Sequence, residues 1–80
     1  MYYVYLLRSE LNPEKTYVGF TLDLKKRFKA HNAGQSVHAS NFKPWKLETY
    51  LAFASEERAR EFEYYLKSHS GKAFAKKCLW

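Results

Sequence analysis

The size of this chain limits its fold first, because 80 residues allow one small core and leave no room for a second. A core of this size needs side chains that each bury a large apolar area. The chain supplies them as seven Tyr, six Phe and two Trp. Its single cysteine, Cys78, can form no intramolecular disulfide and favours a reducing cytoplasm. We therefore expect one domain over residues 1–80 with an aromatic core.

The charge balance indicates the kind of partner. Fourteen Lys and Arg against eight Asp and Glu give a net charge of +6, which favours a polyanion such as nucleic acid. A basic surface that serves only solubility is the alternative. No apolar run approaches the roughly 20 residues that span a bilayer. Residues 1–8 lack the basic start of a signal peptide, and no segment reads as a basic membrane-surface helix. We expect nucleic acid rather than a membrane.

Three segments have the composition of strands. Tyr2–Leu7 and Thr16–Phe20 are rich in aromatic and aliphatic β-formers, and the loop between them contains the turn pair Asn12-Pro13. These two segments predict an antiparallel hairpin. Lys46–Phe53 alternates loosely and predicts a third strand.

A first helix is predicted between the second and third strands. Thr21 can cap a helix over residues 22–32, with Asp23 in its first turn to suit the helix dipole. Gly34 is the candidate left-handed residue that ends it. Residues 35–44 are polar and irregular.

A second long helix is predicted from its cap at Ser55 to about Ser68, with a break at Ser70-Gly71. Residues 72–79 can add a last short helical segment. The resulting order is β-β-α-β-α. It predicts an α/β fold of the α+β type, in which helices flank a small, three-stranded, mostly antiparallel sheet.

The first predicted helix places two polar side chains beside its apolar stripe. Leu24 and Phe28 define that stripe, and Arg27 and His31 lie at its edge, one turn apart. An arginine beside a core is costly unless an anion meets it. His31 could equally be a hydrogen-bonded histidine at a helix end.

The second long helix repeats this pattern. Ala59, Phe62 and Leu66 form its apolar stripe, and Glu63 lies at the edge. A half-buried carboxylate needs a cationic partner or a metal. One reading is a purely structural salt bridge between Glu63 and Arg27.

The hairpin adds tyrosines that share strand faces. Tyr3 and Tyr5 share one face of the first strand, and Tyr17 and Gly19 share a face of the second. A glycine inside a strand often marks the close approach of a ligand or another backbone. The alternative is a pair of core tyrosines beside a bulge glycine.

Together these residues resemble the GIY-YIG nuclease domain over nearly the whole chain. Four ordered motifs carry the resemblance: Tyr3-Val4-Tyr5, Tyr17-Val18-Gly19, Arg27-Phe28-Lys29-Ala30-His31-Asn32 and Ala59-x-x-x-Glu63-x-x-Leu66-Lys67. The departures are mild. Tyr3 replaces Gly, and Val4 and Val18 each replace Ile. The most similar members are the short stand-alone ones akin to the N-terminal endonuclease domain of UvrC.

The resemblance implies a metal-dependent endonuclease that hydrolyses phosphodiester bonds, in DNA rather than RNA, with repair or recombination as its setting. It makes Glu63 the protein ligand of Mg²⁺ or Mn²⁺. It makes Tyr17 the group that positions and deprotonates the attacking water. Tyr5, on the neighbouring strand, would orient Tyr17 or a phosphate oxygen. Arg27 would hold the scissile phosphate. His31 would orient the nucleophile or contact phosphate.

The resemblance also implies a wider binding surface for the nucleic acid backbone. Its residues would be Gly19, Lys25, Lys26, Arg27, Lys29 and Lys67. A domain this small has no separate element to read base edges, so a protein partner would have to supply sequence specificity. Two alternatives stay open: a non-catalytic nucleic-acid-binding module on the same scaffold, and a protein-interaction domain.

Overall fold

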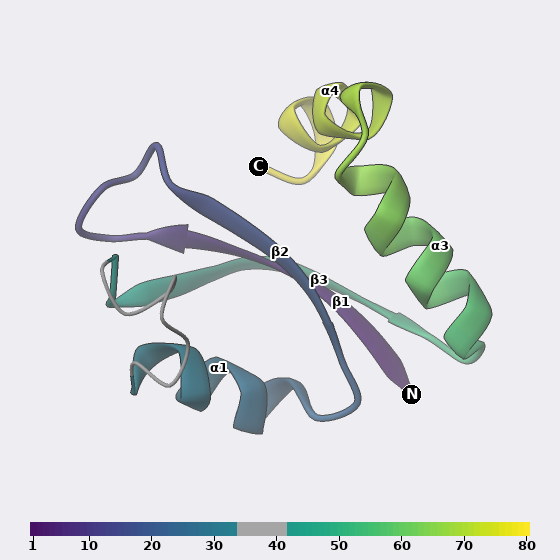
Figure 1. The fold of residues 1–80 in the computed structure, drawn as a ribbon, viewed down its shortest axis with the longest axis horizontal. Helices are drawn as coiled ribbons and strands as arrows, with labels where there is room; N and C mark the ends of the chain where they lie inside the picture. The colour runs from purple at the N-terminus through teal and green to yellow at the C-terminus, as the bar shows by residue number, and fades with distance from the viewer. Residues whose placement is uncertain (34–41) are drawn as a thin grey trace.

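The computed structural model describes residues 1–33 and 42–80 and contains one three-stranded antiparallel sheet (Figure 1). The strands are β1 (Tyr2–Ser9), β2 (Thr16–Thr21) and β3 (Trp45–Phe53), in the order β2-β1-β3. Each lies where the sequence predicts it, although β1 continues to Ser9. The predicted hairpin is confirmed, because β1 pairs with β2 in antiparallel register.

Helices cover both faces of the sheet. Helix α1 (Leu24–Asn32) lies on one face, and α3 (Glu56–Leu66) and α4 (His69–Cys78) lie on the other (Figure 1). The order is β-β-α-β-α-α, so the predicted α+β class is confirmed. None of the helices described here is long and apolar enough to cross a membrane.

The central strand β1 is buried on both faces, and alternation along it divides the core in two. Val4 and Leu6 pack beneath α3 and α4, and Tyr5 and Leu7 face α1. All four side chains are almost completely buried. One short strand thus supplies the centre of both cores.

Helix α1 begins later than predicted, because Asp23 rather than Thr21 is its N-cap. Asp23 Oδ1 accepts the Lys26 backbone N–H at 3.1 Å, so the helix begins at Leu24. The Thr21 hydroxyl oxygen instead accepts the backbone N–H of Asp23 at 3.1 Å. Gly34, the predicted end of this helix, lies outside the described residues, as do residues 35–41.

The break between the last two helices is also displaced. Ser55 caps α3 as predicted, but α3 ends at Leu66 and Ser68 caps a new helix, α4. The Ser68 hydroxyl oxygen accepts the Gly71 backbone N–H at 3.1 Å, so Gly71 lies inside α4 and does not break a helix. A Cβ at Gly71 would overlap the Tyr65 carbonyl oxygen, so the glycine allows α4 to pack closely against the end of α3.

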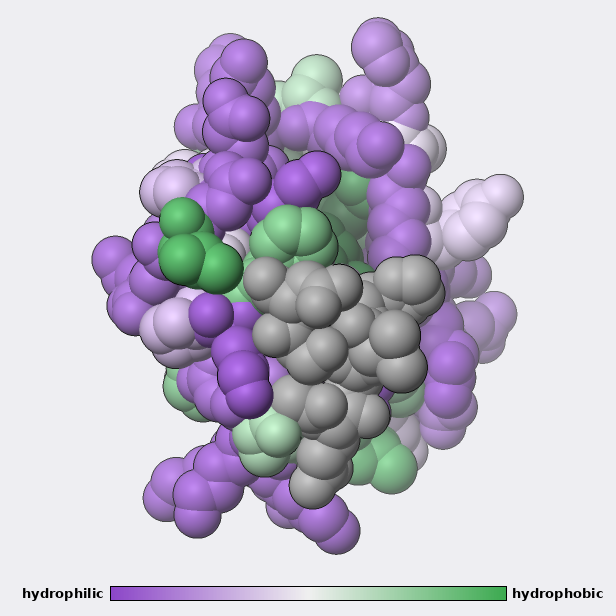
Figure 2. Space-filling view, turned by 60° about the vertical axis from the view of Figure 1, so that its left-hand side comes forward, coloured by the Kyte–Doolittle hydropathy of each residue, from purple (hydrophilic) through white to green (hydrophobic). Residues whose placement is uncertain are grey.

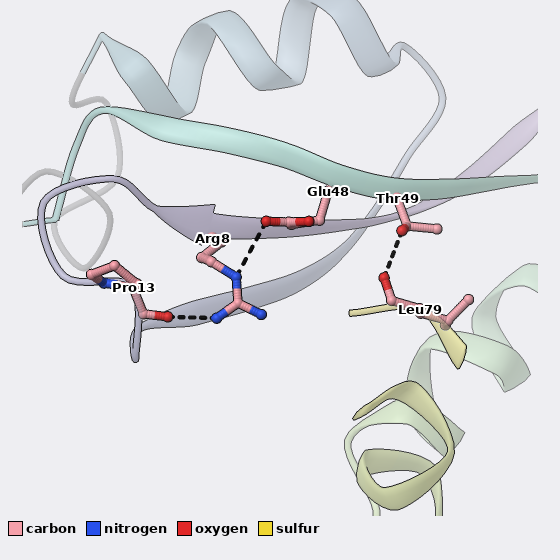
Figure 3. A network of polar contacts seen from close by, with 5 residues as sticks. All are labelled: Arg8, Pro13, Glu48, Thr49 and Leu79. Atoms are coloured by element: carbon pink, nitrogen blue, oxygen red, sulfur yellow. Dashed lines mark hydrogen bonds and ion pairs between the residues drawn. The ribbon is translucent and has the colours of Figure 1, made fainter. Parts of the chain in front are cut away.

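The end of α4 is held against the sheet by polar contacts (Figure 3). Thr49 Oγ1 on β3 donates to the Leu79 carbonyl oxygen at 2.7 Å. Arg8 on β1 pairs with Glu48 at 3.2 Å, and its guanidinium lies 5.0 Å from the centroid of the Trp80 ring. These contacts fix where α4 lies relative to β1 and β3.

We predict that Gly71→Ala lowers the free energy of unfolding by about 1–3 kcal/mol, because the added methyl group would force α4 away from Tyr65. Chemical denaturation followed by circular dichroism measures this change. Ser70→Ala, at the exposed neighbouring position, should stay within about 0.5 kcal/mol of wild type. A stabilised Gly71→Ala variant would show instead that helix propensity outweighs the close contact.

Candidate active site

Helix α1 carries two candidate site residues to the sheet. Its Leu24 and Phe28 pack on the core that contains Tyr5, as the apolar stripe predicts. His31 is buried, with 2% of its surface exposed, whereas Arg27 lies in the exposed part of the helix. One turn of helix therefore places a buried imidazole and an accessible guanidinium side by side.

A buried hydrogen-bonded chain connects these two residues through Tyr5. Arg27 Nε donates to Tyr5 Oη at 3.2 Å, and Tyr5 Oη lies 3.0 Å from His31 Nε2. Arginine can only donate, so the Tyr5 oxygen accepts from Arg27. We assign the Tyr5 O–H as the donor to Nε2, which places the imidazole proton on Nδ1. Nδ1 is buried and has no hydrogen-bond partner among the described residues.

The pKa shifts fit this assignment of protons. Burial raises the pKa of Tyr5 to about 12, so its hydroxyl keeps its proton at neutral pH. Burial, and then the nearby Arg27 charge, lower the pKa of His31 and favour the neutral ring. The hydrogen bond to Tyr5 raises the pKa of Arg27 and keeps it charged.

Tyr17 and Gly19 of β2 complete this side of the site. The Tyr17 ring lies with its centroid 4.8 Å from that of His31 and 6.1 Å from that of Tyr5. Gly19 pairs with Tyr5 across the two strands, and a Cβ there would overlap Tyr5 Cζ and Oη. The close approach predicted at this glycine therefore exists, and the side chain of Tyr5 makes it.

Glu63 stands apart from this group. Its Oε2 accepts from Lys67 Nζ at 3.0 Å, and its side chain is 22% exposed. The described residues show no ion pair between Glu63 and Arg27, so the reading in which these two form a salt bridge is wrong. Arg27 bonds to Tyr5 instead. Lys67, four residues after Glu63 at the C-terminal cap of α3, supplies the cation that Glu63 needs.

The donor set around Glu63 fits a hard divalent cation. Glu63 Oε1 bonds to no described residue, so one carboxylate oxygen remains for a ligand. Nowhere in residues 1–33 and 42–80 do three His, Cys, Asp or Glu side chains gather. Glu63 would therefore be the single protein ligand from this part of the chain. Mg²⁺ and Mn²⁺ accept such a site, because water and phosphate oxygens can fill the remaining positions.

The predicted backbone-binding lysines lie at the surface. Lys25, Lys26 and Lys29 are exposed on α1, and Lys67 is exposed at the C-terminal cap of α3. The face of the molecule in Figure 2 is largely hydrophilic, with only small separate hydrophobic patches. Together with the net charge of +6, this surface suits a polyanion.

Two residues support the site in a way that the sequence reasoning missed. Asn32 Nδ2 donates to the Trp45 carbonyl oxygen at 3.2 Å, and Asn32 Oδ1 accepts the Trp45 backbone N–H at 2.5 Å. This double hydrogen bond clamps the end of α1 to the start of β3, directly after His31. The pair His31-Asn32 in the third motif was the available signal, but the sequence alone does not reveal Trp45 as the partner.

Comparison with known proteins gives a consistent result. The sequence model of the GIY-YIG catalytic domain matches residues 1–77. A UPF0213 protein from Clostridium perfringens is 38% identical over 68 residues, which cover 84% of this chain and 71% of the relative. A UPF0213 protein from Streptococcus pyogenes serotype M5 is 38% identical over 66 residues, which cover 81% and 70%. One from Vibrio campbellii is 37% identical over 65 residues, which cover 80% and 61%. The names of these relatives state no activity.

We predict that His31 stays neutral at pH values where a free imidazole is half protonated. Its ¹⁵N resonances, identified by their loss in His31→Gln, should titrate below the ordinary pKa of 6.5 and show the proton on Nδ1. Arg27→Met should raise the pKa of His31 only in part, because burial is the larger cause. The control Lys26→Met should leave it unchanged.

The lowered pKa of His31 determines whether its ionisation raises or lowers the free energy of unfolding as the pH changes. A histidine whose pKa is lowered in the folded state favours folding above pH 6.5, and this contribution disappears as the pH falls below that value. The free energy of unfolding should therefore fall with pH below about 6.5 more steeply in wild type than in His31→Gln. Equal slopes would contradict a buried, neutral His31.

Proposed function

Because the chain belongs to the GIY-YIG family, a nuclease-type family, we propose that it is a divalent-metal-dependent endonuclease that hydrolyses phosphodiester bonds in DNA. One observation carries the proposal beyond family membership. The buried chain from His31 through Tyr5 holds Arg27 by its Nε at the surface of a basic domain. A fixed arginine with an accessible fork is suited to bind a phosphate.

Arg27 would hold the scissile phosphate. Its Nε is bound to Tyr5, so the plane of the guanidinium is set before substrate arrives, and the exposed side chain can offer Nη groups to two phosphate oxygens. Hydroxide and phosphodiester repel each other, so positive charge that is already in place lowers the barrier to attack. Preorganisation by Tyr5 removes the need to order this side chain during the reaction.

Tyr5 and His31 act as positioning residues in this scheme. Both are buried, with 1% and 2% of their surface exposed, so they reach substrate through Arg27 rather than directly. The raised pKa of Tyr5 makes its hydroxyl a stable hydrogen-bond donor and a poor base. His31 accepts that hydrogen bond and keeps the Tyr5 oxygen turned toward Arg27.

Tyr17 is the residue that we assign to the attacking water. It is half-buried, packs against His31, and lies next to Tyr5 on the neighbouring strand. Its hydroxyl would orient the water, and as a phenolate it would also take the water's proton.

Glu63 would hold Mg²⁺ or Mn²⁺ through a carboxylate that the fold leaves only partly engaged. The chemistry that such a cation would supply at Glu63 is positive charge that offsets the negative charge of the reacting phosphate. Lys67, now paired with Glu63, is near enough to bind the backbone of the same substrate.

The choice of DNA and a setting in repair or recombination rest on the resemblance to UvrC-like nucleases and on the charge of +6. The described residues contain no separate module that could enter a groove and read bases. We therefore propose selection by the shape of the substrate, with any sequence preference supplied by a protein partner.

We predict that wild type nicks labelled DNA in the presence of Mg²⁺ or Mn²⁺ and that Glu63→Gln does not, because the amide cannot hold the cation in the same way. Denaturing gels with single-stranded, duplex, flapped and branched DNA measure cleavage and show the preferred shape. Glu61→Gln is the matched control, since Glu61 is an exposed carboxylate on the same helix, and it should cut like wild type. If all three proteins bind DNA without cutting any substrate, the domain is a binding module instead.

We predict that Arg27→Lys lowers the single-turnover cleavage rate roughly hundredfold or more, although it keeps the charge. Lysine lacks the Nε donor to Tyr5 and the planar fork for phosphate. Arg58→Lys makes the same exchange at an exposed position on α3 and should leave the rate unchanged. Thermal unfolding of both variants checks that the loss is not due to unfolding. A rate close to wild type would remove Arg27 from the phosphate site.

A further inference from the structure

A groove of about 510 Å³ lies between the edge strand β2 and the two helices on that face of the sheet. The residues that line it include Tyr17, Val18, Leu66, Lys67, Lys72 and Trp80. Apolar side chains and an indole ring occur together with two lysines. This combination suits a nucleic acid strand, whose sugars and bases are largely apolar and whose phosphates are charged.

The groove is continuous with the candidate active site through two residues. Tyr17 lines the groove and also packs against His31. Lys67 lines it and also pairs with Glu63. A strand whose reacting phosphate lies between Arg27 and Glu63 would therefore enter this groove on one side.

Lys72 is the second lysine that lines the groove, and it is not among the residues of the candidate active site. It lies in the first turns of α4, and its backbone N–H donates to the Ser68 carbonyl oxygen at 2.9 Å. Its side chain forms no ion pair with any residue in the described ranges, whereas Lys67 is paired with Glu63. An unneutralised lysine beside an apolar wall attracts an anion.

The wall that carries Lys72 is held in place from both ends. Gly71, the preceding residue, packs against the Tyr65 carbonyl oxygen at the end of α3. At the other end of α4, the Leu79 carbonyl oxygen accepts a hydrogen bond from Thr49 Oγ1 (Figure 3). The guanidinium of Arg8 lies over the ring of Trp80, the residue that follows. The groove is thus part of the packed fold, and the backbone that carries Lys72 is held in place beside it.

We propose that this groove binds the DNA strand that leads away from the reacting phosphate, with Lys72 contacting a flanking phosphate. The inference rests on the proposed function, because the DNA bound in the groove would be the same molecule whose reacting phosphate lies between Arg27 and Glu63. Trp80 and Val18 provide the apolar surface against which the sugars and bases of that strand lie.

The test measures binding apart from cleavage. Fluorescence anisotropy with labelled single-stranded DNA, in the Glu63→Gln background, gives the dissociation constant at several salt concentrations. Lys72→Gln should bind several times more weakly, and the slope of log K against log salt should be less steep by about 0.7, the value for one phosphate contact on a single strand. Lys77→Gln is the matched control: it removes the same charge from the same helix, but Lys77 does not line the groove.

Charge reversal extends the comparison, since Lys72→Glu should weaken binding further than Lys77→Glu, and thermal unfolding confirms that all four variants fold. Equal affinities and salt slopes for the Lys72 and Lys77 variants would overturn the proposal that the groove binds DNA, even if wild type cuts DNA. If only the Lys72 variants bind more weakly and wild type cuts no substrate, the proposed DNA-binding groove is supported and the proposed endonuclease activity is wrong. If the protein neither binds nor cuts DNA, both proposals fail.

Discussion

The structure depends on how the Tyr5 hydroxyl is accommodated inside a strand that is buried on both faces. Strand β1 is the middle of three strands, and helices cover it above and below, so its side chains must be apolar or fully paired. Tyr5 meets this condition because Arg27 and His31 reach its oxygen from one turn of α1. The same contacts that satisfy a buried polar atom also fix an arginine at the surface, so stability and site geometry are coupled here.

Two glycines give the fold the close contacts that this arrangement needs. Gly19 leaves room for the ring of Tyr5 on the neighbouring strand, and Gly71 lets α4 pack against the end of α3. Neither position has space for a Cβ, so the requirement is steric in both cases. The first glycine serves the hydrogen-bonded side of the site. The second sets the position of the helix that forms the wall of the groove.

The sequence predicted those features that depend on local spacing. Strand alternation separated Tyr5 from Val4, and helical spacing put Arg27 and His31 on one face, because both patterns follow from backbone geometry alone. Prediction from the sequence failed where two neighbouring residues could each cap the same helix, or where a side chain contacts a residue that is distant in the chain. Thr21 and Asp23 can both cap a helix, and only the observed backbone decides between them. Glu63 could form an ion pair with Arg27 or with Lys67, and the structure shows the pair with Lys67. The hydrogen bonds between the Asn32 side chain and the Trp45 backbone could not be predicted, because sequence spacing does not indicate such tertiary contacts.

The proposed catalytic groups lie on both sides of the edge strand β2. Arg27, Tyr5 and His31 belong to the face under α1. Glu63 on α3 and Lys67, the residue directly after α3, lie on the opposite face. Tyr17, on the edge strand itself, is in contact with His31 and also lines the groove. A phosphate that binds both Arg27 and Glu63 must therefore lie across the edge of the sheet. Among the described residues no strand pairs with the outer edge of β2. A nucleic acid that crosses this edge would follow the helices that flank it on either side of the bound phosphate.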